Sequence, residues 1–374
     1  MTVWNDERYS DHLAHANWMA HTSVLMYLNE RVTGDAARDW LSSWAHRWFV
    51  GDRLRVLVLG CGEGWLERAV AQWPFVAKID AVDFAADAVA RAREAARGVD
   101  KIEYGVVDLN RDTLPRAAYD VVVAHSVLHH VENLEHAYAQ IEQAMKPDAT
   151  LLVNEYVGPS RFQFSDDVLR ILNALLDCIR RGETRTRPSV EEMIANDPTE
   201  AVRSEELLGF TERHFDIRER KDLGGTILQH LLYGIVQHYR FDVPRERGVI
   251  DMLCAIEGML VDAQRIASDF VLLAARKRGS NVTKTNRPLP SRAEGASDIE
   301  PDPLRLPYGR RAARAPRVPL RLLRIALASQ QQRRANLFAE SHFYAFRERL
   351  LGMRMPDDPT FRRLIETAAT LAHE

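Results

Sequence analysis

The feature that most limits the fold of this chain is a glycine-rich stretch at residues 56–64, VLVLGCGEG. Four apolar residues before a glycine turn are typical of a short strand that is buried on both faces of a parallel sheet. Gly60, Gly62 and Gly64 allow backbone conformations that residues with a β-carbon rarely adopt, and they let main-chain N–H groups approach a ligand. Apolar residues recur at helical spacing from Trp65 onward, so we expect the loop to end at the N-terminus of a helix.

A glycine-rich loop can be a ligand site or only a tight turn without a ligand. The residues that follow this loop favour a ligand site. Residues 78–84, KIDAVDF, read as a second strand that ends in Asp83. A doubly wound nucleotide-binding fold places a carboxylate at this point, against the two hydroxyls of a ribose. The spacing is not the G-x-G-x-x-G of a dinucleotide site, because Trp65 stands where that pattern has its last glycine. We therefore expect a cofactor that contains a nucleoside and is not a nicotinamide dinucleotide.

Four stretches, VLVLGCGEG, AVDF, VVDLN and YDVVVAHSVLHHV, resemble the class I S-adenosylmethionine-dependent methyltransferases. The resemblance covers roughly residues 50–278 and implies S-adenosylmethionine as the cofactor. In that family the glycine loop passes under the methionine part of the cofactor, the acid after the second strand holds the ribose, and an acid after the third strand lies near the adenine. Carried over to this chain, the cofactor-binding positions are Gly60, Cys61, Gly62, Gly64, Asp83, Phe84, Asp108, Leu109 and His125.

The order of apolar runs predicts an α/β fold with a doubly wound, seven-stranded, Rossmann-like sheet. Further strands are expected at residues 102–109, 119–124, 150–153, 215–220 and 270–275. The resemblance implies that the final strand runs antiparallel to the others. Around the sheet we expect a helical N-terminal extension, a helical insertion and a C-terminal helical tail.

These elements divide the chain into four parts. Residues 1–50 form the N-terminal extension, and residues 51–278 form the cofactor-binding domain, with its insertion at about 160–224. Residues 279–318 are rich in Pro, Ser, Arg and Gly and read as a flexible linker before a helical segment at 319–374. Because all seven strands have candidates before Gly279, we expect residues 1–278 to fold without the remainder.

All seven tryptophans lie within the first 73 residues. Trp40, Trp44 and Trp48 recur every four residues, which is typical of an apolar stripe that packs a helix on the sheet. The alternative is that an aromatic ring, first of all that of Trp18, closes over the cofactor's sulfonium by cation–π attraction. We expect no metal site: His12, His15 and His21 lack a nearby cysteine and read as surface or capping residues.

The candidate catalytic residues follow the fourth and fifth strands. Transfer to a hydroxyl acceptor benefits from a base, and a histidine near neutral pKa suits that task. His129 and His130 lie at the expected end of the sheet, Glu155 is a second candidate base, and Tyr156 could position the acceptor. The alternative is that the LHHV segment only packs and forms hydrogen bonds around its loop.

The function predicted from these features is methyl transfer to a small-molecule or sugar acceptor, at oxygen. A net charge of −3 and a pI near 6.5 exclude a globally basic nucleic-acid binder. Base-methylating members of the family usually carry Asn or Asp, two prolines and an aromatic residue after the fourth strand, whereas this chain has His125, Ser126 and Val127. Two alternatives stay open: a methyltransferase acting on a macromolecule, and a cofactor-binding interaction protein without catalysis.

The last part of the sequence bears on location. Residues 305–334 contain nine arginines and no acidic residue, which suits either a solvated tail or contact with an anionic membrane surface. The N-terminus lacks the apolar core of a signal peptide, and no run of 18 apolar residues is present. Cys61, Cys178 and Cys254 are too far apart in sequence to suggest a disulfide framework. We therefore expect a cytoplasmic protein, and peripheral contact with a membrane stays open as the alternative to a solvated tail.

Overall fold

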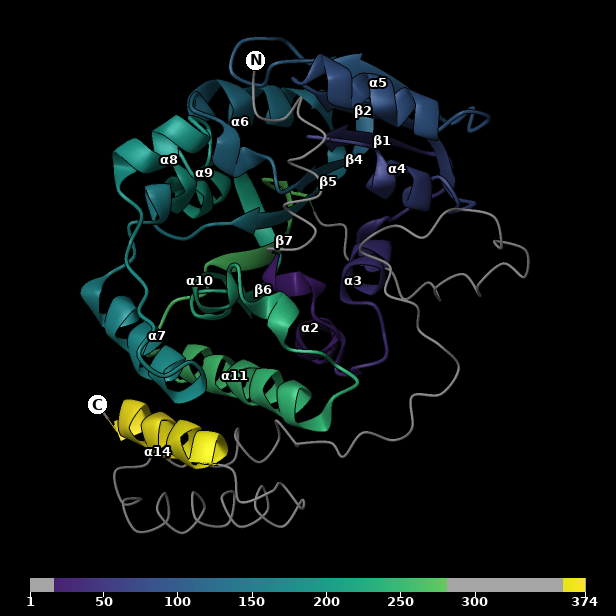
Figure 1. Cartoon of the computed structure of the whole chain (residues 1–374). Helices are drawn as coiled ribbons and strands as arrows, with labels where there is room; N and C mark the ends of the chain where they lie inside the picture. The colour runs from purple at the N-terminus through teal and green to yellow at the C-terminus, as the bar shows by residue number, and fades with distance from the viewer. Residues whose placement is uncertain (1–16, 281–358, 374) are drawn as a thin grey trace.

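The computed structural model describes residues 17–280 and 359–373, and its core is a sheet of seven strands (Figure 1). The strand order is β3-β2-β1-β4-β5-β7-β6, in which β7 runs antiparallel to both of its neighbours and the first five strands are parallel. The strands are β1 (Leu54–Leu59), β2 (Val76–Asp83), β3 (Ile102–Val106), β4 (Tyr119–His125), β5 (Met145–Tyr156), β6 (Phe215–Gly224) and β7 (Phe270–Lys277). The predicted fold class is confirmed, including the antiparallel final strand.

The first strand shows why the sheet is covered on both faces. Val56 and Val58 belong to one apolar cluster, and Leu57 and Leu59 belong to a second, as the two-residue repeat of a strand requires. The first cluster includes residues of α3 (Trp40–Trp48), α4 (Trp65–Val70) and α5 (Ala86–Ala95). The second includes residues of α6 (Leu134–Ala144) and α9 (Leu207–His214). Helices therefore flank the parallel strands on both sides, and ligands are confined to the strand ends.

The N-terminal extension packs as the tryptophan pattern predicted. It comprises η2 (Trp18–Ala20), α2 (Thr22–Thr33) and α3, and the three tryptophans of α3 are all buried. His21 caps α2, because its Nδ1 accepts a hydrogen bond from the N–H of Ser23 at 3.1 Å. The sequence offers two acids before α3, and its N-cap is Asp39, whose Oδ1 accepts the N–H of Ser42 at 2.7 Å. Asp35 accepts the N–H of Ala37 in the preceding turn.

Two predicted strand boundaries were wrong. The third strand, β3, ends at Val106 and not at residue 109, and the fifth, β5, begins at Met145 and continues through Pro147. Met145 pairs with Tyr119 and Thr150 with Val121, so Pro147 lies in the irregularity between these pairs, where a missing N–H is tolerated. Between β6 and β7 the chain forms α10 (Leu228–Leu232), η6 (Val236–His238) and α11 (Pro244–Asp262).

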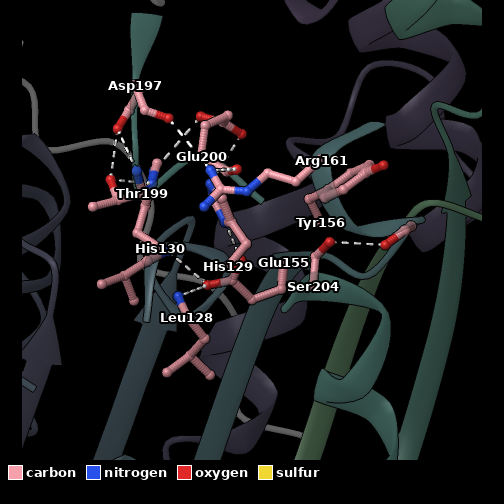
Figure 2. A network of polar contacts seen from close by, with 12 residues as sticks. Leu128, His129, His130, Glu155, Tyr156, Arg161, Asp197, Thr199, Glu200 and Ser204 are labelled. Atoms are coloured by element: carbon pink, nitrogen blue, oxygen red, sulfur yellow. Dashed lines mark hydrogen bonds and ion pairs between the residues drawn. The ribbon is translucent and has the colours of Figure 1, made fainter. Parts of the chain in front are cut away.

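The insertion after β5 is shorter than expected. It contains η4 (Ser160–Phe162), α7 (Asp166–Ile179), α8 (Val190–Asn196) and η5 (Ser204–Glu206), whereas α9 and β6 belong to the layers of the sheet domain. Ser189 and Glu192 form a capping box at the start of α8. The stretch between α8 and η5 crosses the ends of β4 and β5 (Figure 2), and it contributes residues to the site described below.

The C-terminal segment packs against the catalytic fold, and our expectation that residues 1–278 fold without it stays a prediction. Helix α14 (Pro359–His373) lies beside α7 and α11 at one end of the molecule (Figure 1). Leu364, Ile365 and Leu371 are buried in the same apolar cluster as the sheet residues of the first face. Thr367 also contacts the thiol of Cys178 on α7 at 3.3 Å.

Several predictions concern residues outside the described ranges. These are the two histidines at positions 12 and 15, most of the linker, the arginine-rich stretch and the start of the final helical segment. Within residues 17–280 and 359–373, no helix combines the length and the hydropathy that a bilayer crossing requires. The three cysteines are free and buried.

Candidate active site at the strand ends

The glycine loop between β1 and α4 has the backbone that its sequence predicts. Gly60, Gly62 and Gly64 have φ values of 68°, 51° and 78°. A β-carbon at Gly60 would lie 2.4 Å from the Cβ of Val127, and one at Gly64 would lie 2.4 Å from the Oη of Tyr104. Gly62 has no atom within 4 Å of that position, so its backbone faces open space. Packing therefore requires glycine at positions 60 and 64, whereas Gly62 leaves its main chain open to a ligand.

The carboxylate of Asp83 is fixed against this loop. Its Oδ2 accepts the N–H of Gly62 and its Oδ1 accepts the N–H of Ala85, both at 2.9 Å. Each oxygen keeps a further lone pair, because an ionised carboxylate can accept about four hydrogen bonds. Phe84 follows with a side chain that is 40% exposed. The structure thus brings the loop, the acid and an exposed aromatic ring together at adjacent strand ends.

Cys61, Asp108 and Leu109 differ in whether their side chains can contact a ligand. The Cys61 side chain is buried, and burial raises the pKa of its thiol, so only its main chain can take part. Asp108 accepts hydrogen bonds from the N–H and Nδ2 of Asn110 at 2.9 and 3.0 Å, and it pairs with Arg111. Leu109 is buried. Asp108 therefore stabilises its own turn and is only partly free to meet a ligand.

His125 connects β4 to the glycine loop. Its ring lies edge-to-face against that of Trp65, the first residue of α4, with 5.4 Å between centroids. Its Nδ1 is 2.8 Å from the Nδ2 of Asn154 on β5. Burial lowers the pKa of His125 to about 4, so the ring is neutral at neutral pH. His125 is suited to contact a ligand by its ring and not to carry charge.

Glu155 organises the turn after β4. It lies in β5 with no exposed surface, and its Oε1 accepts the N–H groups of Val127 and Leu128, both at 2.6 Å. Its Oε2 is 2.7 Å from the Nδ1 of His129, in η3 (Leu128–His130). The carboxylate can only accept, so the hydrogen-bond network assigns a proton to Nδ1 of His129. Glu155 is committed to these three donors and holds His129 in place (Figure 2).

A loop from the insertion, residues 197–202, covers η3. The guanidinium of Arg161 fastens this loop by donating to three of its carbonyl oxygens, those of Asp197, Pro198 and Glu200. The N–H of Val202 donates to the carbonyl of His129 at 3.0 Å. The loop is therefore attached both to the insertion and to η3.

This loop brings Glu200 to the two histidines. One oxygen of Glu200 lies 3.8 Å from the Nε2 of His129, and the other lies 4.0 Å from the Nε2 of His130. The Nδ1 of His130 contacts Oγ1 of Thr199 at 3.2 Å. Figure 2 shows the imidazoles and the carboxylate facing one another.

The electrostatics of the two histidines differ. Burial alone lowers the pKa of His129, but the charge and hydrogen bond of Glu155, with the charge of Glu200, outweigh it and raise the pKa to about 9. For His130, burial and the neighbouring His129 lower the pKa well below its usual range. Burial raises the pKa of the Glu200 carboxyl.

Two sequence-based expectations for aromatic residues do not match this geometry. Tyr156 is buried and its hydroxyl donates to the carbonyl of Pro159 at 3.0 Å, so it does not face an acceptor. Trp18 is also buried, with its ring 5.5 Å from that of Phe270. Both rings pack against that of Phe270.

Sequence reasoning found the histidines and Glu155 but missed the loop that faces them. Arg161, Thr199 and Glu200 lie in an insertion whose irregular backbone has no apolar repeat to place it. The only local signal is the spacing of Asp197 and Thr199, which form a side-chain turn with Thr199 N–H donating to Asp197 Oδ1 at 2.8 Å.

Comparison with known proteins identifies the sheet domain. A family model described as a methyltransferase domain matches residues 57–153. The chain carries a class I S-adenosylmethionine-dependent methyltransferase domain. The matched residues run from β1 to β5 and so include the glycine loop, Asp83 and η3 of the methyltransferase domain.

Individual relatives match the same region. An uncharacterized methyltransferase of Mycobacterium tuberculosis is 32% identical over 105 residues, which cover 28% of this chain and 52% of that protein. A malonyl-acyl-carrier-protein O-methyltransferase of Halalkalibacterium halodurans is 29% identical over 132 residues, covering 34% of this chain and 48% of that protein. The chain thus spans about half the length of the curated relatives it matches. Among solved structures, an S-adenosylmethionine-dependent methyltransferase from Mesorhizobium loti aligns with a TM-score of 0.41 at 19% identity, covering 64% of this chain and 97% of that chain.

Proposed function

We propose that this protein transfers the methyl group of S-adenosylmethionine to an oxygen of a small-molecule or sugar acceptor. The observation that carries the proposal is the hydrogen bond between Asp83 and Gly62. It lies at the carboxyl ends of β1 and β2, beside β4, where the strand order reverses. Open sheets of this kind bind ligands at that point.

The residues at these strand ends fit the cofactor. The backbone of Gly62 is open to a ligand, and Asp83 keeps lone pairs for the two ribose hydroxyls. Phe84, Leu109 and the turn of Asp108 are assigned to the adenine side, and Gly60, Cys61 and Gly64 to the methionine side. When bound, the cofactor supplies an electrophilic methyl group on sulfur. The chain's own contribution is to hold the nucleophile close and aligned, because in-line displacement depends most on orientation.

The acceptor side is assigned to η3 and the loop that covers it. His129 and His130 present their Nε2 atoms there, and Glu155 acts as a positioning residue for His129. With a pKa of about 9, His129 is protonated at neutral pH in the absence of a ligand, so it orients an acceptor oxygen better than it removes a proton. The name of the Halalkalibacterium halodurans relative, an O-methyltransferase, supports oxygen as the acceptor atom.

The test uses the full chain and cofactor carrying a labelled methyl group. The protein is incubated separately with the small-molecule and the macromolecular fractions of an extract from its own cell, and labelled products are identified by mass. We expect label in a small molecule and an oxygen-linked methyl group. Label only in protein or nucleic acid would favour the macromolecular alternative. Cofactor binding without any labelled product would favour the interaction protein.

A further inference from the structure

Three side chains at the acceptor side converge like ligands of a single ion. One ligand atom of each of His129, His130 and Glu200 lies within 4.8 Å of the other two. The Nε2 of His129 is 3.8 Å from Oε1 of Glu200, and the Nε2 of His130 is 4.0 Å from Oε2 of the same carboxylate. Ligands bound at 2.0–2.2 Å in a tetrahedron stand roughly 3.3–3.6 Å apart. Small side-chain rotations would therefore bring one atom of each residue within bonding distance of a single ion.

The hydrogen bonds behind the imidazoles point both Nε2 atoms at this space. Glu155 accepts from Nδ1 of His129 at 2.7 Å. Thr199 donates its hydroxyl to Asp197 Oδ1 at 2.7 Å, so its oxygen is left to accept from Nδ1 of His130. A metal ion that displaces the Nε2 proton of His129 leaves each imidazole with its proton on Nδ1 and with the lone pair of Nε2 as a ligand. Carboxylate and hydroxyl partners of this kind orient the histidine ligands of metal sites.

The charge around the three donors also suits a cation. Three carboxylates, those of Glu155, Asp197 and Glu200, lie around the imidazoles. The guanidinium of Arg161 donates to carbonyl oxygens of the loop that carries Asp197 and Glu200. Glu155 is fully buried, and Asp197 is 6% exposed. Buried charges need a partner of opposite sign, and a divalent cation would provide it.

We propose that His129, His130 and Glu200 form a binding site for a divalent transition-metal ion of the zinc type. Two imidazole nitrogens and one carboxylate favour such an ion over magnesium or calcium, which prefer oxygen ligands. Three protein ligands leave a position of a four-coordinate ion for water or an oxygen of the acceptor. The site replaces our expectation from the sequence that no metal is bound. It does not depend on the proposed methyl transfer, because ion binding is measured without cofactor or acceptor.

The experiment measures ion binding by the full chain. The protein is stripped with a chelator, dialysed and titrated with Co²⁺, whose visible absorption reports a four- or five-coordinate site, and Zn²⁺ is then added. We expect one ion per chain by elemental analysis and displacement of Co²⁺ by Zn²⁺ but not by Mg²⁺. Glu200→Gln, which keeps the side-chain shape, should weaken binding by at least about 100-fold. Thr199→Val, which removes the partner of His130, should weaken it by about 10- to 100-fold.

A matched control separates the site from surface histidines. His214 pairs with Glu142 at 2.9 Å and has no second histidine in the pair, so His214→Ala should bind Co²⁺ as the wild type does. Equal affinity of the wild type and Glu200→Gln would overturn the proposal, as would displacement by Mg²⁺ as effective as that by Zn²⁺. If circular dichroism shows that Glu200→Gln does not fold, the comparison of Thr199→Val with His214→Ala decides in the same way.

Discussion

Asp83 joins the end of β2 to the glycine loop, so one side chain both shapes the loop and faces the ligand space. Its two carboxylate oxygens accept the N–H groups of Gly62 and Ala85. The carboxylate keeps further lone pairs beside Gly62, and no atom of the described residues lies within 4 Å of a β-carbon placed there.

We predict that Asp83→Ala weakens S-adenosylmethionine binding by about 1.5–3 kcal/mol, the range for hydrogen bonds to a charged group. This corresponds to roughly a 10- to 150-fold rise in Kd, which calorimetry can measure. Asp87→Ala, at an exposed position in the first turn of α5, is the control and should bind as the wild type does. Unchanged affinity in Asp83→Ala would show that the ribose lies elsewhere.

Glu155 is a second residue whose role follows from its partners. Replacing it by Ala leaves the N–H groups of Val127 and Leu128 buried without an acceptor. Each such loss costs about 1–3 kcal/mol. We therefore predict that Glu155→Ala lowers the free energy of unfolding by several kcal/mol, whereas Glu155→Gln, which keeps one acceptor oxygen, lowers it less. Denaturant unfolding would contradict this prediction if the two variants were equally stable.

Residue by residue, the sequence predicted those parts of the site that follow strands. Gly62 and Asp83 were placed correctly because a strand end fixes where the next residues lie. Glu200 was not found, because it reaches the histidines only through tertiary contacts made by Arg161 and Val202. The residues next to Glu200 in the sequence do not indicate that its side chain lies beside the two histidines.

At the scale of the element, α4 shows how a helix pattern can mislead. The apolar residues after the glycine loop predicted a helix, and α4 forms there, but Ala69 is exposed and Glu67 is fully buried. Neither carboxyl oxygen of Glu67 has a hydrogen-bond partner among the described residues. Glutamate suits a helix but is almost never fully buried without a partner, so its burial here was not predictable from the sequence.

Burial raises the pKa of Glu67 to about 8, which makes the stability of the fold depend on pH. Above the unfolded pKa of about 4.5 the unfolded chain releases this proton, while the folded chain retains it up to pH 8. Stability therefore falls as pH rises through this window, by about 5 kcal/mol in total.

We predict that Glu67→Gln removes this pH dependence, since the amide does not ionise. The measurement is the difference between the free energies of unfolding at pH 5 and pH 8, for the wild type and for the variant. Glu94→Gln, on the exposed face of α5, should leave the wild-type difference in place. Parallel pH profiles for the wild type and Glu67→Gln would contradict the assignment.

At the scale of the whole molecule, the sheet and its helical layers were predictable from the sequence, but the packing position of α14 was not. The doubly wound sheet was predicted from the alternation of strands and helices, a pattern that extends over the whole domain. Helix α14 is amphipathic, but its partner surface on α7 and α11 lies far away in sequence. An apolar helix face does not say by itself which surface will cover it.

We predict that Leu364→Ala lowers the free energy of unfolding by about 2–5 kcal/mol, because Leu364 is fully buried where α14 meets the rest of the fold. Glu366→Ala changes an exposed position of the same helix and should have little effect. If thermal unfolding shows the two variants to be equally stable, α14 does not contribute to the core.

The position of α14 also sets an order of events during synthesis. The last strand of the sheet ends at Lys277, but the helix that covers α7 begins at Pro359. A nascent chain that has just released β7 from the ribosome can complete its sheet while the apolar face of α7 is still uncovered. That face is a surface for chaperones to hold until the final helix emerges, and ribosome-bound chains stopped on either side of α14 should differ in protease sensitivity at α7.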